Sequence, residues 1–209
     1  MSEANIKLAL TGREPRLSTG AGRHGARKLS LRRLATMLNA LPPDAVALDA
    51  AAEMLRNEEF FVRYNAAKML SRRGDREARL IIQEALEHGE PPTRAVAARH
   101  LYGFSWFSAE PLIRAALKDP DFRVREAAIY ALCDLRELAA YELMTDVLKR
   151  EGDDLKLAAA WGLRDSQDAA AVSVLEVVLQ AADPDVRIKG LEALGQKTRP
   201  KPCPWYDAR

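Results

Sequence analysis

The feature of this chain that most constrains its fold is an internal repeat with a period of 31 residues. A basic residue recurs five times at this spacing, as Arg63, Arg94, Arg125, Lys156 and Arg187. In each copy Val, Leu or Thr lies one position earlier, Ala or Gly three positions later and Leu seven positions later. The offsets −1, +3 and +7 mark one stripe of an α-helix, and the small residue at +3 lets a neighbouring helix approach closely.

A second helical pattern recurs at the same period between the basic residues. Its apolar positions are Ala50, Ala51, Met54 and Leu55, then Ile81, Ile82, Ala85 and Leu86, with three further copies each displaced by 31 residues. Turns such as Asp119-Pro120-Asp121 separate the two patterns, and Asp suits a helix N-cap while Pro suits the first turn. The sequence therefore predicts an all-α, right-handed α-solenoid of about five to six antiparallel helix pairs.

The predicted array covers residues 29–196 and begins with an irregular helix over 29–41. Residues 1–28 are expected to form a basic, mobile N-terminal arm, and residues 197–209 a Pro-rich C-terminal tail. Charge follows this division: residues 1–33 hold eight Lys or Arg and two acids, whereas residues 34–194 hold 20 bases and 27 acids. An acidic body with basic ends is the expected charge pattern.

Composition excludes several classes of protein. The 209 residues carry a net charge of only +2, which does not indicate a bulk nucleic-acid binder. The two cysteines form no CxxC motif, so a disulfide framework and a structural zinc site are not expected. No apolar run is long enough to span a membrane, and the N-terminus lacks the apolar core of a secretory signal. We expect a cytoplasmic protein with no membrane contact.

The repeat resembles the HEAT-like repeat of the phycobilisome-lyase type, whose unit is about 30 residues long. The best copy runs from Asp119-Pro120-Asp121 through Val124-Arg125 to Ala128 and closes on Leu132. The resemblance implies an α-solenoid, and it covers about residues 29–196. It leaves the activity open, since such proteins include bilin lyases, chaperone-like subunits and adaptors.

No set of residues predicts catalysis, a cofactor site or a metal site. The string Gly20-Ala21-Gly22-Arg23-His24-Gly25 fits GxGxxG, but no strand precedes it. No His-Glu dipeptide occurs, although HEAT proteins of the deoxyhypusine hydroxylase type bind iron through such pairs. His100 is predicted to pack in the interior. The row of basic residues is predicted to bridge repeats by pairing with helix ends and with the acids four residues earlier, Glu59, Glu90, Asp121 and Asp183.

Outward positions of the first helices suggest an interaction surface. The predicted patch consists of Tyr130, Leu157, Trp161 and Ile188, and either the C-terminal tail or another chain is expected to cover it. The turn from Tyr102 to Phe107 is a second aromatic cluster, predicted to plug an inter-helix loop or to form the lip of a ligand site.

The predicted function is a non-catalytic scaffold or adaptor that binds another protein or a second copy of itself. One alternative is a bilin lyase or a chaperone-like subunit that handles a tetrapyrrole, which the family resemblance allows. The other is a nucleic-acid binder that uses the basic arms. The one basic stretch expected on the second helices is Arg114, Lys118, Lys149 and Arg150, and acids are interspersed among the neighbouring outward positions.

Overall fold

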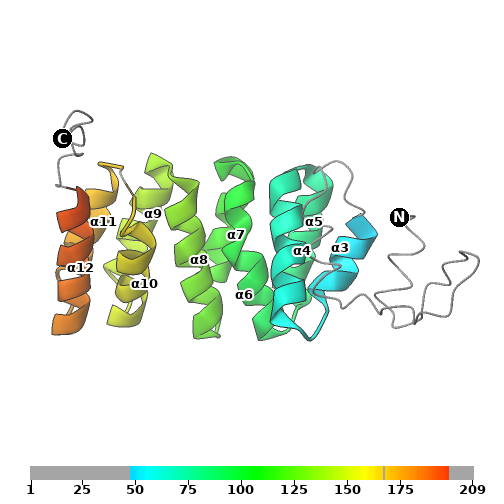
Figure 1. Cartoon of the computed structure of the whole chain (residues 1–209), viewed down its shortest axis with the longest axis horizontal. Coiled ribbons are helices and arrows are strands. Elements are labelled where there is room, and N and C mark those ends of the chain that lie inside the picture. Colours follow the sequence, from blue (N-terminus) through cyan, green and yellow to red (C-terminus); the bar gives the residue numbers. More distant parts are fainter. Residues whose placement is uncertain (1–47, 167, 198–209) are drawn as a thin grey trace, which may run out of the picture. The chain divides into compact units, whose positions relative to one another are not determined.

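The computed structural model describes residues 48–166 and 168–197. Within these ranges the chain forms ten α-helices and one short 3-10 helix, with no strand (Figure 1). The chain divides into two compact units, the first ending at Val124 and the second beginning at Arg125. We describe each unit by itself.

Unit 1 is a stack of helices in which each helix packs on the next and on the next but one. Thus α3 contacts α4 and α5, α4 contacts α5 and α6, and α5 contacts α6 and α7. The elements are α3 (Leu48–Leu55), α4 (Phe60–Arg73), α5 (Arg76–His88), α6 (Pro91–Arg99), η2 (Leu101–Gly103), α7 (Trp106–Ala116) and the first residues of α8 (Phe122–Leu135). This contact pattern is that of stacked helix pairs.

Unit 2 repeats the same arrangement. Here α9 contacts α11, α10 contacts α11 and α12, and α11 contacts α12. The elements are the remainder of α8, followed by α9 (Leu138–Leu148), α10 (Asp153–Leu163), α11 (Ala171–Val178) and α12 (Pro184–Lys197). The helix α12 is the last element that the structure describes.

The 31-residue register is confirmed. The five basic residues lie on α4, α6, α8, α10 and α12, and the second pattern forms α3, α5, α7, α9 and α11. The Ala residues at +3, from Ala66 to Ala159, are fully buried. At the last copy, a methyl group on Gly190 would lie 3.0 Å from Val178 Cγ1 and 3.1 Å from Leu179 Cδ2, so the small residue sets the approach of α12 to α11.

The ends of the predicted array lie outside the described residues. These are the arm of residues 1–28, the irregular helix at 29–41 and the tail from residue 198 onward. At the C-terminal end, α12 extends to Lys197, one residue past the predicted end of the array.

The acidic residues before two of the first helices include the predicted N-caps. Asp119 accepts a hydrogen bond from the Asp121 backbone N–H at 2.9 Å, and Asp183 accepts one from the Asp185 N–H at 2.8 Å. Asp183 directly precedes α12 and Asp185 is the second residue of that helix, so this bond is an N-cap bond. Asp121 caps α8 in the same way, because its side chain accepts from the Arg123 N–H at 2.9 Å. The N-cap prediction is therefore confirmed for Asp121 and Asp183, whereas Asp119 shapes the loop before α8.

At three of the five copies, the recurring Arg ties its helix to the backbone beyond the end of the preceding helix. Arg63 Nη1 donates to the Asn57 and Glu58 carbonyls at 2.7 and 2.6 Å, and Arg187 Nη1 donates to the Ala181 and Ala182 carbonyls at 2.8 and 2.7 Å. These carbonyls lie just beyond the C-termini of α3 and α11, where the helix leaves acceptors unsatisfied. The repeated base is therefore structural.

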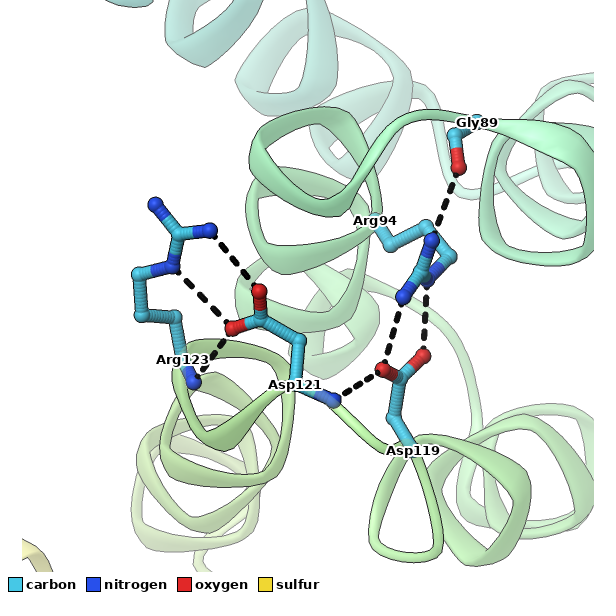
Figure 2. A network of polar contacts seen from close by, with 5 residues as sticks. All are labelled: Gly89, Arg94, Asp119, Asp121 and Arg123. Carbon is cyan, nitrogen blue, oxygen red and sulfur yellow. Dashed lines mark hydrogen bonds and ion pairs between the residues drawn. The ribbon is translucent and has the colours of Figure 1, made fainter.

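Arg94 makes the same contact and adds a link to the following repeat (Figure 2). Its Nη1 donates to the Gly89 carbonyl at 3.1 Å, while Nε and Nη2 both donate to the Asp119 carboxylate at 2.8 Å. Both side chains of this pair are mostly buried. The predicted carboxylate partner, Glu90, is wrong for Arg94, because the hydrogen-bonded carboxylate lies 25 residues later in the chain.

This network shifts the protonation of its members. The two hydrogen bonds from Arg94 hold the pKa of the Asp119 carboxyl below its usual value, and the same bonds raise the pKa of Arg94. Arg123 donates to both carboxylate oxygens of Asp121, and mainly for this reason the pKa of Asp121 falls to about 2. All of these groups therefore remain charged at neutral pH.

We predict that Asp119→Asn makes the protein less stable at neutral pH and less sensitive to acid. The bidentate pair contributes through charged hydrogen bonds, so the free energy of unfolding at pH 7 should fall by about 1–3 kcal/mol. Since the folded-state pKa of Asp119 is depressed, its contribution is full above the unfolded pKa, about 3.9, and is lost as pH falls through the folded value. Urea unfolding from pH 7 to pH 2 measures both effects.

The control for this experiment is Asp165→Asn, because Asp165 is a strongly exposed carboxylate next to Arg164. It should change stability little at any pH. An acid-dependence of Asp119→Asn equal to that of the parent would contradict the assigned role of the pair.

We also predict that Ala128→Leu destabilises the protein by about 1–3 kcal/mol, because Ala128 is fully buried at the +3 position and extra volume there forces neighbouring groups apart. Thermal unfolding followed by circular dichroism measures the change. The matched variant Ala115→Leu adds the same group at an exposed helical position and should be nearly neutral. Equal stability of the two variants would show that the packing assigned to the +3 position is incorrect.

Candidate interaction surface

The outward positions predicted from the repeat lie on the first helices of unit 2. Tyr130 is on α8, Leu157 and Trp161 are on α10, and Ile188 is on α12. Trp161 is 44% exposed and Ile188 is 50% exposed, whereas Tyr130 and Leu157 are half-buried. The structure thus places Trp161 and Ile188 on the exterior, as their helical angle predicts, and buries the other two more deeply than expected.

Two cations flank the indole of Trp161. The Arg164 guanidinium carbon lies 5.5 Å from the ring centroid and the Lys189 Nζ lies 5.2 Å from it. Arg164 is on the turn that follows α10, whereas Lys189 is on α12, so the indole joins two adjacent first helices. At exposed sites each such contact contributes about 0.5–1 kcal/mol. The contacts hold the ring in one orientation on the surface.

Tyr130 is partly buried because α8 and α10 approach closely at Gly162. A methyl group on Gly162 would lie 2.6 Å from Cys133 Sγ and 3.2 Å from Tyr130 Cδ1. The side chain of Tyr130 therefore packs on the backbone of α10. Cys133 is buried beside Met144, with 3.9 Å between the two sulfur atoms, as expected for an inert helix residue.

Carboxylates lie on the same two helices. Glu126 on α8 is half-buried, and its pKa is raised first by burial and then by the negative charge of Asp154 on α10. Unit 2 therefore presents an exposed apolar centre at Trp161 and Ile188, with cations beside the indole and an acidic pair on α8 and α10. We call Tyr130, Leu157, Trp161 and Ile188, with the flanking Arg164 and Lys189, the outer surface.

The four basic candidates are exposed but belong to different units. Arg114 and Lys118 are in unit 1, and Arg114 pairs with Glu110 at 2.9 Å. Lys149 and Arg150 are in unit 2, and Lys149 lies 3.9 Å from Asp146. Acidic partners on the same helices thus accompany two of the four charges.

Unit 1 contains a row of aromatic rings that the sequence analysis missed. The ring centroids of Phe60 and Tyr64 are 5.9 Å apart, those of Tyr64 and His100 are 4.7 Å apart, and those of His100 and Tyr102 are 5.9 Å apart. His100 is buried and its Nδ1 lies 2.9 Å from the Val96 carbonyl oxygen, so the prediction that it packs in the interior is confirmed. Phe60 and Tyr64 lie on α4, whereas His100 follows α6 and Tyr102 lies in η2, so no single spacing would have revealed the row.

The aromatic turn plugs the interior at only one position. Phe104 is 4% exposed and fills the space beside η2, as predicted for a plug, while Phe107 at the start of α7 is 89% exposed. Phe107 therefore does not act as a plug. The amphipathic pattern of α7 does not indicate that its second residue faces outward so fully.

A cleft of about 230 Å³ opens between α3 and α5 in unit 1. Its lining includes the apolar residues Leu55, Ile81 and Ala85 and the Arg56–Glu84 ion pair, in which the N···O distance is 3.0 Å. Pockets that enclose small organic ligands are usually about 300–1,000 Å³. The cleft is therefore smaller than a typical ligand pocket.

In the part of the chain that the structure describes, no group of three or more His, Cys, Asp or Glu side chains is arranged to hold a metal ion. Of the helices over residues 48–197, none combines the length and the apolar character needed to cross a membrane.

Comparison with known proteins gives one family and two similar structures. The family model for HEAT repeats matches residues 78–164. No curated protein matches the chain. The complex of CpcE and CpcF of phycocyanin lyase from Nostoc sp. PCC7120 is similar over 94% of this chain and 83% of that chain, with 22% identity and a TM-score of 0.42. Human deoxyhypusine hydroxylase in complex with glycerol is similar over 96% and 76%, with 20% identity and a TM-score of 0.36.

Proposed function

Because this chain is a HEAT-like repeat protein, matched by the family model over residues 78–164, we propose that it is a non-catalytic scaffold that binds another protein. The proposed contact is the outer surface of unit 2, centred on Trp161. A stack of helix pairs presents a regular array of outward side chains on a rigid support, which suits the binding of a folded partner or an extended segment.

The observation that carries this proposal is the exposure of Trp161. An indole that is 44% exposed and held in one orientation between two cations presents a large apolar side chain to a binding partner. Exposed Trp residues are among the side chains that most often dominate binding energy in protein interfaces. Ile188, 50% exposed on the neighbouring first helix, extends the apolar area.

The charges around the indole indicate the chemistry of the partner. Arg164 and Lys189 retain exposed side chains, although Lys189 also pairs with Glu192 at 2.9 Å. An apolar side chain that stacks on the indole, next to a carboxylate that faces these cations, would complement the surface. The proposed partner therefore carries an apolar anchor beside acidic residues.

The tetrapyrrole alternative rests on the resemblance of the repeat alone. The cleft between α3 and α5 is small for such a ligand, and its Arg56 is paired with Glu84. Adding a bilin to the purified protein discriminates between the two functions. A shift of the bilin absorption band, with quenching of Trp161 emission, would favour the tetrapyrrole role over the scaffold.

We predict that Trp161→Ala separates binding from folding. Because the indole lies on the surface, the free energy of unfolding should fall by about 1 kcal/mol or less, far below the roughly 3–5 kcal/mol expected for a core aromatic. Binding of the native partner should weaken by about 2 kcal/mol or more, roughly 30-fold. Urea unfolding and titration of the captured partner give the two values.

The partner is first identified with a photo-cross-linking amino acid at position 161 in the native host. Position 107 is the matched control, because Phe107 is an exposed aromatic on a helix of unit 1. A protein cross-linked from position 161 and not from position 107 supports the proposal. The same adducts from both positions, or none from position 161, would reject it.

A further inference from the structure

The last helix, α12, exposes a position that all earlier copies of the repeat bury. Four residues after each basic anchor lie Ala67, Ala98, Ile129 and Ala160, and each is at most 2% exposed. The equivalent residue on α12 is Leu191, which is 58% exposed. The register thus identifies Leu191 as a core position that lacks its cover.

Ile188 lies on the same side of α12 as Leu191, one helical turn earlier, and is 50% exposed. In the earlier first helices of unit 2, the residues equivalent to Ile188 are the half-buried Glu126 and Leu157. We call Ile188 and Leu191 the end face. A solenoid normally closes its last repeat with a polar outer side, and this end face is apolar instead.

We propose that the C-terminal tail of the same chain, residues 198–209, docks on the end face through Trp205 and Tyr206. The tail begins where α12 ends, at Lys197, so it is tethered beside the face that it would cover. It contains the apolar sequence Pro204-Trp205-Tyr206, which is large enough to bury both exposed side chains.

The length of the tail suits this contact. Leu191 lies six residues before the end of α12, or about 9 Å along the helix axis. Residues 198–205 include Pro200, Pro202 and Pro204, and in an extended conformation they span about 25 Å. This is enough to reverse direction and bring Trp205 back to Leu191.

Charge also favours the contact. Asp185 and Glu192 are exposed on α12, and the tail carries Arg199 and Lys201 before its aromatic residues. Groups of opposite sign would therefore flank the apolar contact. This steers the tail toward α12 and contributes little to the affinity itself.

A second copy of the chain is a weaker candidate for the same face. Stable protein interfaces bury about 800 Å² per partner. The end face offers two exposed large apolar side chains on one helix of 14 residues, about 21 Å long. A tethered segment needs far less area, because it loses no translational freedom on binding. The proposal rests on the exposure of Leu191, which is not part of the outer surface, so it does not depend on the proposed function. Ile188 belongs to both surfaces, and the docked tail would occupy the edge of the outer surface at that residue.

The first test uses Trp205 as a probe in the full-length chain. With Trp106→Phe and Trp161→Phe, Trp205 is the remaining tryptophan, and its emission and acrylamide quenching report its exposure. We expect blue-shifted emission and weaker quenching than in a free peptide of residues 198–209. Adding Leu191→Asp should restore the values of the free peptide, whereas Leu138→Asp, at another exposed leucine of unit 2, should not.

The second test uses the cysteine in the tail. In a Leu191→Cys variant, Cys203 should form an intramolecular disulfide with the new thiol in a glutathione redox buffer, while Cys133 remains buried and unreactive. The matched variant Leu138→Cys should form no such bond. This test does not depend on whether the fluorescence variants fold.

Three results would overturn the proposal. In the first, acrylamide quenches Trp205 in the chain that carries Trp106→Phe and Trp161→Phe as strongly as in the free peptide. In the second, Cys203 forms a disulfide with the introduced thiol equally well in the Leu191→Cys and Leu138→Cys variants. In the third, the protection of Trp205 from quenching depends on protein concentration and sedimentation shows a dimer. The end face would then be covered by a second copy of the chain.

Discussion

Close packing at one recurring position supports the whole array. The residue three positions after each basic anchor is Ala or Gly, and it is buried in every copy, from Ala66 to Gly190. A larger residue there would hold neighbouring helices further apart. At Gly190, for example, an added methyl group would press on Val178 and Leu179. Within each unit, the described helices therefore depend on their neighbours to cover this side. This dependence makes interior repeats alike and leaves the last helix with an apolar side that nothing within the described residues covers.

Electrostatic contacts follow the same period. The helix ends leave carbonyl groups without partners, and the recurring Arg satisfies them at Arg63, Arg94 and Arg187. The link from Arg94 to Asp119 joins consecutive repeats in unit 1 and keeps both groups charged. A row of bases on a solenoid could suggest a phosphate-binding track. These three bases instead donate to the backbone of their own chain, so the row belongs to the architecture.

Function is then left to positions that the repeat does not constrain. The outward side chains one and five positions after the basic anchor differ from copy to copy, and the exposed aromatic residues among them are Tyr64, at 36%, and Trp161, at 44%. Its position between Arg164 and Lys189 gives the surface both shape and charge. A scaffold that binds through such positions can change its partner without changing its fold, because these side chains are not part of the buried stripe.

The sequence by itself determined the helix pairs, their register and the buried stripe, because a 31-residue period in residue size and polarity is a local signal that any two repeats share. It also placed Trp161 and Ile188 on the exterior through their helical angle. Only the tertiary structure decided that Arg94 pairs with Asp119, that the rings of Tyr64 and His100 meet edge to face, and that Tyr130 is half-buried against Gly162. Each of these contacts joins residues more than 20 positions apart, and their geometry depends on how closely two helices approach, which the period alone does not specify.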